Sequence, residues 1–228
     1  MTGKYPHEEP LDKILIYKAN EDLWVWGETI PKTRRRGSAG IVVKDNFAYI
    51  LCGITDGHWD GHVPWADRYN FKTGEWISLS DAPRPRDHFQ AALHNDKIYC
   101  ASGRNSSAKT IETFSLTIPE VDVYDIVKNE WTTLSETSNI PTERAGASAI
   151  INKGKLIIIG GESSSQETAH NDIEIMELAT GNWASGDNLV KGRHGTQTIL
   201  YKNTIYIAAG SGNRGGKPEL ATLEAFTK

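Results

Sequence analysis

Four short apolar runs, each ending in a glycine, recur along the chain. They read FAYILCG at 47–53, KIYCASG at 97–103, KLIIIGG at 155–161 and TIYIAAG at 204–210. Runs this short, rich in β-branched and aromatic residues, are typical of β-strands. Similar intervals separate the four runs, and such self-similarity indicates an internal repeat.

Fixed offsets extend the repeat beyond these runs. The residues used as anchors are Tyr49, Tyr99, Ile157 and Tyr206. Thirteen positions before the anchors stand Arg36, Arg86, Arg144 and Arg193. Three positions before the anchors stand Asn46, Asp96, Gly154 and Asn203. These last residue types tolerate positive φ, so a tight hairpin is predicted before each run.

A second set of offsets recurs between the runs and once before the first of them. A tryptophan comes seven residues after a tyrosine or methionine, in the pairs Tyr17/Trp24, Tyr69/Trp76, Tyr124/Trp131 and Met176/Trp183. We therefore expect units of four short strands. Strand a begins at the arginine, strand b ends at the glycine, strand c carries the tyrosine and strand d the tryptophan. Tight hairpins join a to b and c to d, whereas the b–c loops are long.

This pattern predicts an all-β fold. Four-stranded antiparallel units of this length pack side by side as the blades of a β-propeller. The residues resemble the Kelch repeat, in which an apolar run ends in Gly-Gly and is followed by a Tyr and then a Trp. The full pair stands at Gly160–Gly161, and the first glycine is replaced by Cys52, Ser102 or Ala209 in the other units. The resemblance implies a Kelch-type propeller, similar to bacterial Kelch-repeat proteins and to the galactose oxidase-like propeller architecture. It implies no settled activity.

Counting the strands divides the single predicted domain, residues 1–228, into blades. Residues 11–31 supply strands c and d, and residues 191–228 supply strands a to c. Three full blades occupy 32–83, 84–141 and 142–190. Seventeen strands fit an incomplete part of a six-bladed ring, with a four-bladed ring as the alternative. An open edge invites pairing with another chain, so an oligomer is possible.

Composition narrows the classes of partner. A formal net charge of −4 gives no electrostatic reason to expect nucleic acid. No apolar run reaches the roughly 18–20 residues that would cross a membrane. The N-terminus contains no signal peptide, although export stays open if that end is truncated. Cys52 and Cys100 lie in apolar runs, which favours buried thiols over a disulfide. No cofactor is indicated.

The alternation of strand direction assigns the loops to two faces. The b–c loops and the starts of the a strands share one face, where long loops are expected to bind a ligand. The predicted ligand-binding residues on this face are Arg36, Arg86, Arg144, Arg193, Arg104, Gln90 and Gln197. Several arginines around an axial pocket would hold an anion. Alternatively, the four repeated arginines pair with a neighbouring blade's carboxylates or with backbone carbonyls.

The loop ITDGHWDGHVPWADRYN stands outside the repeat. Its alternating metal-ligand types, a weak candidate site, are Asp56, His58, Asp60 and His62. An extended chain would place all four on one side. The Asp-Gly pairs that contain Gly57 and Gly61 are also ordinary turn formers, so a turn is the alternative to the extended state. Trp59 and Trp65 have no packing role in the repeat, so we expect them to offer apolar faces to a sugar or a protein.

Two functional classes remain. The first is a binding or interaction module that takes a glycan, a small anion or a protein on the b–c loop face. The second is a sugar-active enzyme, mutarotase-like or epimerase-like, an activity found in some propellers of similar type. An enzyme needs an acid or base in the axial pocket. The candidates are His88, His194, Glu162 and Asp87.

Overall fold

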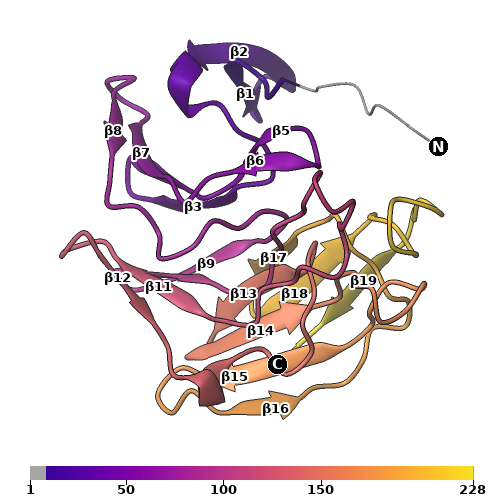
Figure 1. Ribbon diagram of the computed structural model, residues 1–228. Coiled ribbons are helices and arrows are strands. Elements are labelled where there is room, and N and C mark those ends of the chain that lie inside the picture. Colours follow the sequence, from indigo (N-terminus) through magenta and orange to yellow (C-terminus); the bar gives the residue numbers. More distant parts are fainter. Residues whose placement is uncertain (1–8, 228) are drawn as a thin grey trace.

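The computed structural model describes residues 9–227 and is an all-β fold whose antiparallel sheets are arranged as propeller blades (Figure 1). The β1 (Lys13–Lys18) and β2 (Leu23–Thr29) strands form a hairpin at one end. The first four-stranded sheet contains β3 (Gly40–Lys44), β4 (Phe47–Leu51), β7 (Ala66–Asn70) and β8 (Trp76–Ser78). Two short 3-10 helices, Lys32–Arg34 and Glu136–Ser138, lie in connections between blades.

Two further sheets repeat this arrangement, and a three-stranded sheet follows. The second blade contains β9 (Ala91–His94), β10 (Lys97–Cys100), β11 (Asp122–Asp125) and β12 (Glu130–Thr133). The third contains β13 (Ser148–Asn152), β14 (Lys155–Ile159), β15 (Ile173–Glu177) and β16 (Trp183–Ser185). The last contains β17 (Thr198–Tyr201), β18 (Thr204–Ala208) and β19 (Leu223–Phe226).

The described residues thus contain the seventeen expected strands and one extra hairpin, β5 (Ile54–Asp56) with β6 (Asp60–His62), within the first b–c loop. The all-β propeller and its four-stranded antiparallel blades are confirmed. The division of residues 1–228 into blades and the six-bladed ring remain predictions.

The two sets of sequence offsets have a simple structural meaning. The a–b hairpins turn through two residues, as between Lys44 and Phe47, and positive φ occurs in the turns at Asp45, Asn95, Lys153 and Lys202. The residues seven apart are direct cross-strand partners, as Tyr124 is with Trp131. Their rings lie 5.1 Å apart. Such aromatic pairs across adjacent strands stabilise a sheet beyond the area they bury.

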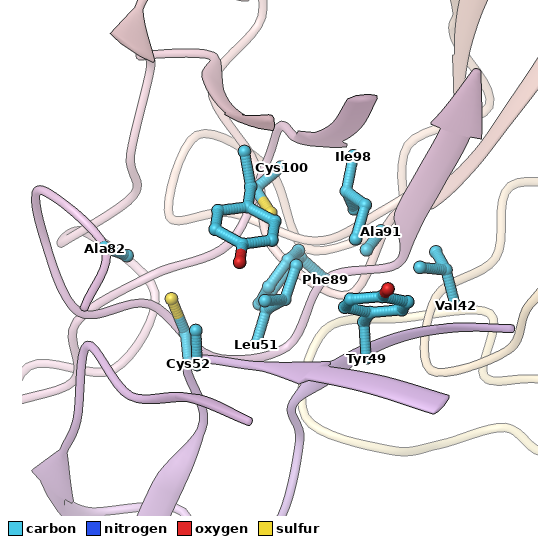
Figure 2. Close-up of a cluster of buried hydrophobic side chains, with 11 residues drawn as sticks. Val42, Tyr49, Leu51, Cys52, Ala82, Phe89, Ala91, Ile98 and Cys100 are labelled. Atoms are coloured by element: carbon cyan, nitrogen blue, oxygen red, sulfur yellow. The ribbon is translucent and has the colours of Figure 1, made fainter. Parts of the chain in front are cut away.

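The hydrophobic core lies between blades rather than within them. In Figure 2, Val42, Tyr49 and Leu51 of the first blade face Ala91 and Ile98 of the second. Equivalent clusters join the second blade to the third and the third to the last. The tryptophans tie neighbouring blades together as well, because Trp131 and Trp183 donate their indole N–H groups to backbone oxygens of the preceding blade, both at 2.8 Å.

The repeated arginine joins three strands of its own blade. Arg144 is buried, and its guanidinium donates to the carbonyl oxygen of Gly160 at the end of strand b, at 2.6 Å. It also pairs with Glu174 of strand c at 2.6 Å. The same ion pair recurs in the four blades that have an a strand, as Arg36–Asp67, Arg86–Asp122, Arg144–Glu174 and Arg193–Glu224.

This geometry corrects the sequence interpretation of these arginines. All four guanidinium groups are paired with a carboxylate of the same blade, not of a neighbouring blade, and none lines the cavity described below. A neighbouring blade contacts the arginine through its backbone instead. The N–H of Gly103, for example, donates to the carbonyl oxygen of Arg144 at 3.1 Å. The four arginines therefore join strands within each blade through their side chains, and their backbone contacts link neighbouring blades.

Replacing Arg144 by methionine tests this structural role. The change leaves the buried Glu174 carboxylate without its cation, and breaking a buried pair in this way costs about 3–5 kcal/mol of unfolding free energy. Urea denaturation followed by circular dichroism measures the loss. Arg35→Met is the matched control, because Arg35 is partly exposed and lies 3.9 Å from Asp12. Equal stability of the two variants would contradict the role.

Candidate functional site

A cavity of about 670 Å³ opens at the centre of the b–c loop face. Residues predicted from the sequence to bind a ligand line this cavity, together with loop residues that were not predicted. The polar and aromatic side chains of its lining are Ser38, His58, Trp59, His88, Phe89, Gln90, Arg104, Thr113, Phe114, Glu162, His194, Thr196 and Gln197. The strand starts and b–c loops of all the blades with an a strand thus converge on one hollow, as their direction requires.

The repeat itself delivers the charged groups. In each blade, the residue after the repeated arginine forms backbone hydrogen bonds in both directions with the residue after the second glycine. The four bridged pairs are Gly37/Ile54, Asp87/Arg104, Ala145/Glu162 and His194/Ser211. The backbone is the same in each case, whereas the side chains differ. The fold therefore does not require a charge at any of these positions.

Arg104 lies between two carboxylates at the base of the cavity. Its Nη1 atom is 2.8 Å from Oε1 of Glu162, and its Nε atom is 3.7 Å from Oδ1 of Asp87. All three side chains are buried. The two carboxylates hold the guanidinium in place and compensate its positive charge. Arg104, which was predicted to bind an anion, is therefore already paired within the protein.

Two histidines contact the buried Asp87. The Nε2 atom of His62 and the Nδ1 atom of His88 each lie 3.2 Å from a carboxylate oxygen. Burial alone would raise the pKa of Asp87. The contacts with His62 and His88 and the charge of Arg104 outweigh burial and lower that pKa to about 2.

His88 occupies an unfavourable backbone conformation. Its φ is +48°, in the left-handed region that non-glycine residues rarely adopt. The same position in the other blades is Ser38, Gly146 and Gly195, and all three also have positive φ. The repeat thus imposes this conformation, and two blades meet it with glycine. The second blade retains an imidazole there at an energetic cost.

That imidazole reaches the extra hairpin. Nε2 of His88 lies 3.1 Å from Nδ1 of His58, and the two rings are 5.1 Å apart at their centroids. His58, His88 and Asp87 therefore form a continuous polar series from the loop to the buried carboxylate. The other two predicted catalytic candidates contact each other, with Nε2 of His194 3.4 Å from Oε2 of Glu162.

The two glutamines have different environments. Gln90 accepts hydrogen bonds from the N–H groups of Ala149 and Thr198, at 3.0 and 3.2 Å, and its amide donates to the Thr198 carbonyl oxygen at 3.1 Å. It therefore ties the inner strands of three blades together at the centre. Gln197 is exposed at the cavity rim and is the more accessible of the two.

The loop with alternating histidines and aspartates does not remain extended. It reverses at 57–59 to form the β5–β6 hairpin, which pairs Asp56 with Asp60, while His62 turns to Asp87 and His58 to His88. Gly57 and Gly61 have positive φ and permit this reversal. The expected one-sided row of four ligands is therefore wrong. Within residues 9–227 no group of three metal-ligand side chains has a geometry that could hold an ion.

The two tryptophans of this loop also separate. Trp59 lines the cavity. Trp65 instead packs under the guanidinium of Arg34, whose central carbon lies 4.5 Å from the ring centroid. The interpretation of Trp65 as a ligand platform is thus corrected to a packing role. Phe114 and the His58–His88 contact were not predicted from the sequence, because both depend on how the b–c loops fold.

Titration of Asp87 should affect stability at acid pH. A pKa below the ordinary value of 3.8 means that the ionised carboxylate stabilises the fold above about pH 4. This contribution disappears as the pH falls from about 4 to about 2. We expect Asp87→Asn to be less stable than the wild type at pH 7, and the gap to narrow by about 2 kcal/mol towards pH 2. Urea unfolding at several pH values measures it. A gap that is independent of pH would contradict the prediction.

The backbone of His88 provides a second test. A left-handed conformation costs about 1 kcal/mol more for alanine than for glycine. His88→Gly should therefore be more stable than His88→Ala by about that amount in thermal or urea unfolding. Asn95, with φ of +53° in an exposed turn, is the matched control, and its glycine and alanine variants should differ similarly. A His88→Ala variant as stable as His88→Gly would exclude strain at this residue.

Comparison with known proteins agrees with the repeat. The KLHDC2/KLHL20/DRC7 Kelch-repeats domain matches residues 3–210. Kelch-like protein terF of Aspergillus terreus is 30% identical over 206 residues, which are 87% of this chain and 43% of that protein. Kelch-like protein 40 of Xenopus laevis is 31% identical over 173 residues, covering 73% of this chain and 26% of that protein.

A solved structure supports the fold. The structure of YjhT superposes with a TM-score of 0.77 at 16% identity, and the match covers 95% of this chain and 73% of that one. The chain spans less than half the length of the two Kelch-like proteins it matches. In the described part of the chain, no helix has the length and apolar character that a membrane crossing needs. The matched domain and the repeats place this chain in the Kelch-repeat family, whose domains typically act as protein-interaction modules.

Proposed function

We propose that this chain is a binding module whose ligand occupies the cavity at the centre of the b–c loop face. The observation that carries the proposal is the difference between side chains at positions where the backbone is the same. Asp87, Arg104, Glu162 and His194 occupy positions filled by Gly37, Ile54, Ala145 and Ser211 in other blades. Arg104, Glu162 and His194 line the cavity, and Asp87 contacts Arg104 and His88 of that lining. Groups that the scaffold does not need, yet gathers at one hollow, are best explained by a ligand.

The charge balance of the cavity favours a hydroxyl-rich ligand over a small anion. The four repeated arginines are paired within their blades, and Arg104 is shared by Asp87 and Glu162. An anion at neutral pH would therefore meet carboxylates as well as cations. A glycan suits the site better, because its hydroxyl groups both donate and accept hydrogen bonds. Trp59 and Phe114 supply apolar surface for a sugar ring.

A protein partner would use the same face. The typical role of Kelch-repeat domains supports this reading, and a polar side chain of the partner would enter the cavity in place of the sugar. The two ligands differ in footprint. A glycan is confined to the cavity, whereas a protein also covers the surrounding loops. Ile111, whose side chain is 80% exposed on the second b–c loop, belongs to that outer surface.

The polar series of His58, His88 and Asp87 favours a second candidate, a sugar-active enzyme. A carboxylate that contacts one nitrogen of an imidazole orients the ring and supports proton transfer at the other nitrogen. The contacts of 3.2 Å and 3.1 Å on either side of His88 have this form. A mutarotase-like or epimerase-like reaction needs such a group. Exchange of anomers followed by NMR would separate an enzyme from a binder, because a binder leaves the exchange rate unchanged.

Binding is tested with a glycan array followed by calorimetry on the sugars retained. Trp59→Ala and His88→Gly should each weaken binding at least tenfold, because the first removes apolar surface and the second removes the imidazole that faces the cavity. Asn95→Gly is the control, since it relieves the same backbone conformation in an a–b hairpin on the opposite face. Its affinity should match that of the wild type.

The controls also distinguish binding from folding. Trp65→Ala should lower stability more than Trp59→Ala does, because the Trp65 indole packs on Arg34. Absence of any retained glycan would overturn the glycan ligand. If a partner protein were then found whose binding is weakened by Ile111→Asp, the face would be a protein-binding surface. A ligand whose affinity is unaffected by both Trp59→Ala and His88→Gly would overturn the site itself.

A further inference from the structure

A second cavity, of about 740 Å³, lies on the face opposite the b–c loops, between the second and third blades. The a–b and c–d hairpins of these two blades form its walls. The polar and charged residues of its lining are His94, Asn95, Asp96, Lys97, Tyr99, Asp125, Lys128, Lys153 and Glu177. Val127, Leu178 and Ala179 add apolar surface. A hollow of this size can hold a small organic ligand.

Neighbouring blades are joined on this face by a contact between their a–b hairpins. The last residue of strand a in one blade contacts the second turn residue of the next blade. Between the first and second blades this contact is an ion pair of Lys44 with Asp96. Between the third and last blades, the amide of Asn152 donates to Oδ1 of Asn203 at 3.3 Å. Lys44 and Asn152 close their hairpins at the same position.

Between the second and third blades the contact is missing. The two positions are occupied by His94 and Gly154, and glycine has no side chain that could meet the imidazole. A Cβ atom at Gly154 would have no neighbour within 4 Å. Both residues line the second cavity. The opening therefore arises from the side chains of this blade pair and is not imposed by the repeat.

The carboxylates of the second cavity already have partners. Asp96 pairs with Lys44, and Glu177 pairs with Lys155 at 2.7 Å. Asp125 accepts hydrogen bonds from two backbone N–H groups of its own turn, both at 3.0 Å. All three acidic groups are thus satisfied within the protein.

The lysines of the lining, by contrast, are available to a ligand. Within residues 9–227 the ammonium groups of Lys97, Lys128 and Lys153 form no ion pair with a carboxylate, and all three side chains are exposed. They come from three different elements, the β10 strand, the β11–β12 turn and the β13–β14 turn. Positive charge therefore gathers at this cavity although the chain as a whole has a formal net charge of −4.

Tyr99 adds a neutral donor. Its side chain is 9% exposed and lines the cavity, and its hydroxyl has no hydrogen-bond partner in the described part of the chain. Burial raises the pKa of Tyr99 above the ordinary value of 10.0, so the hydroxyl is protonated at neutral pH. Polar groups that are this deeply buried normally have a partner, so the free hydroxyl points to an acceptor on a ligand.

We propose that the second cavity binds a phosphate group carried by a small molecule. A phosphate has several acceptor oxygens and a charge of about −1.5 to −2, so it can accept from donors on different turns at once. Lysine binds phosphate as a point charge, whereas a single carboxylate is matched better by the planar fork of arginine, which is absent from this lining. Val127 and Leu178 would contact the remainder of the molecule.

Titration with inorganic pyrophosphate at constant ionic strength, followed by amide NMR shifts, tests the proposal. Saturable shifts should appear at Gly154 and Tyr99. Lys153→Gln and Tyr99→Phe should each weaken binding about three- to tenfold, because each removes one donor. Lys202→Gln is the matched control and should bind like the wild type. Lys202 occupies the same turn position as Lys153, with φ of +47° against +50°, and lies outside the cavity lining.

A further variant closes the cavity. Gly154→Asp restores a side chain opposite His94, as in the Lys44–Asp96 contact, and adds a negative charge. Gly154 has positive φ, which aspartate tolerates, and room for a Cβ atom, so the variant should fold. It should abolish pyrophosphate binding. Amide spectra of every variant verify the fold.

The proposal fails if no shift saturates, if Gly154→Asp binds like the wild type, or if Lys202→Gln weakens binding as much as Lys153→Gln. It also fails if sodium acetate at the same ionic strength produces the same shifts, since these would then report screening of charge. The glycan site is tested separately. Trp59→Ala should retain pyrophosphate affinity and Gly154→Asp should retain glycan affinity, because the two cavities open on opposite faces.

Discussion

A buried arginine in each blade is the interaction on which the rest of the structure depends. A guanidinium is expensive to remove from water unless its charge and donors are matched. The chain meets this requirement with a carboxylate on strand c and with the carbonyl oxygen at the end of strand b, as at Glu174 and Gly160. The backbone carbonyl oxygen of the same arginine accepts a hydrogen bond from the preceding blade, as Arg144 does from the N–H of Gly103. One residue thus fixes three strands and the position of the neighbouring sheet.

The candidate site follows from that constraint. Because the arginine holds the start of strand a against the end of strand b, the residues that follow it reach the cavity in every blade with an a strand, as Ser38, His88, Gly146 and Gly195 do. Glycine, alanine, aspartate and histidine all occupy the position after the arginine, at Gly37, Ala145, Asp87 and His194. The scaffold therefore fixes the position of the backbone here and does not restrict the type of side chain. The result is a hollow lined by one carboxylate, one shared guanidinium and several imidazoles, with a second carboxylate, Asp87, buried against that lining.

Much of the fold could be predicted from spacing because spacing reports local pairing. A separation of seven residues between Tyr124 and Trp131 is the length of a hairpin, and the structure pairs them directly. The arginines were harder to interpret, since their partners lie on strand c. Those acids do stand two residues before each tyrosine or methionine, at Asp67, Asp122 and Glu174, so the signal was present. The contact of His58 with His88 could not be predicted, because it depends on a loop that reverses at its glycines rather than on any repeated offset.

At His88 the backbone conformation favours glycine, whereas the candidate site uses an imidazole. The position two residues after the arginine is left-handed in all four blades, and glycine at Gly146 and Gly195 meets that requirement without strain. A histidine there stabilises neither the turn nor the core between blades. Its imidazole instead joins the buried Asp87 to His58 at the cavity. Strained residues persist where the surrounding structure holds them in place, and such residues cluster at functional sites. The blade that accepts this cost is also the blade that supplies Asp87 and Arg104, and for this reason we place the functional centre of the face there.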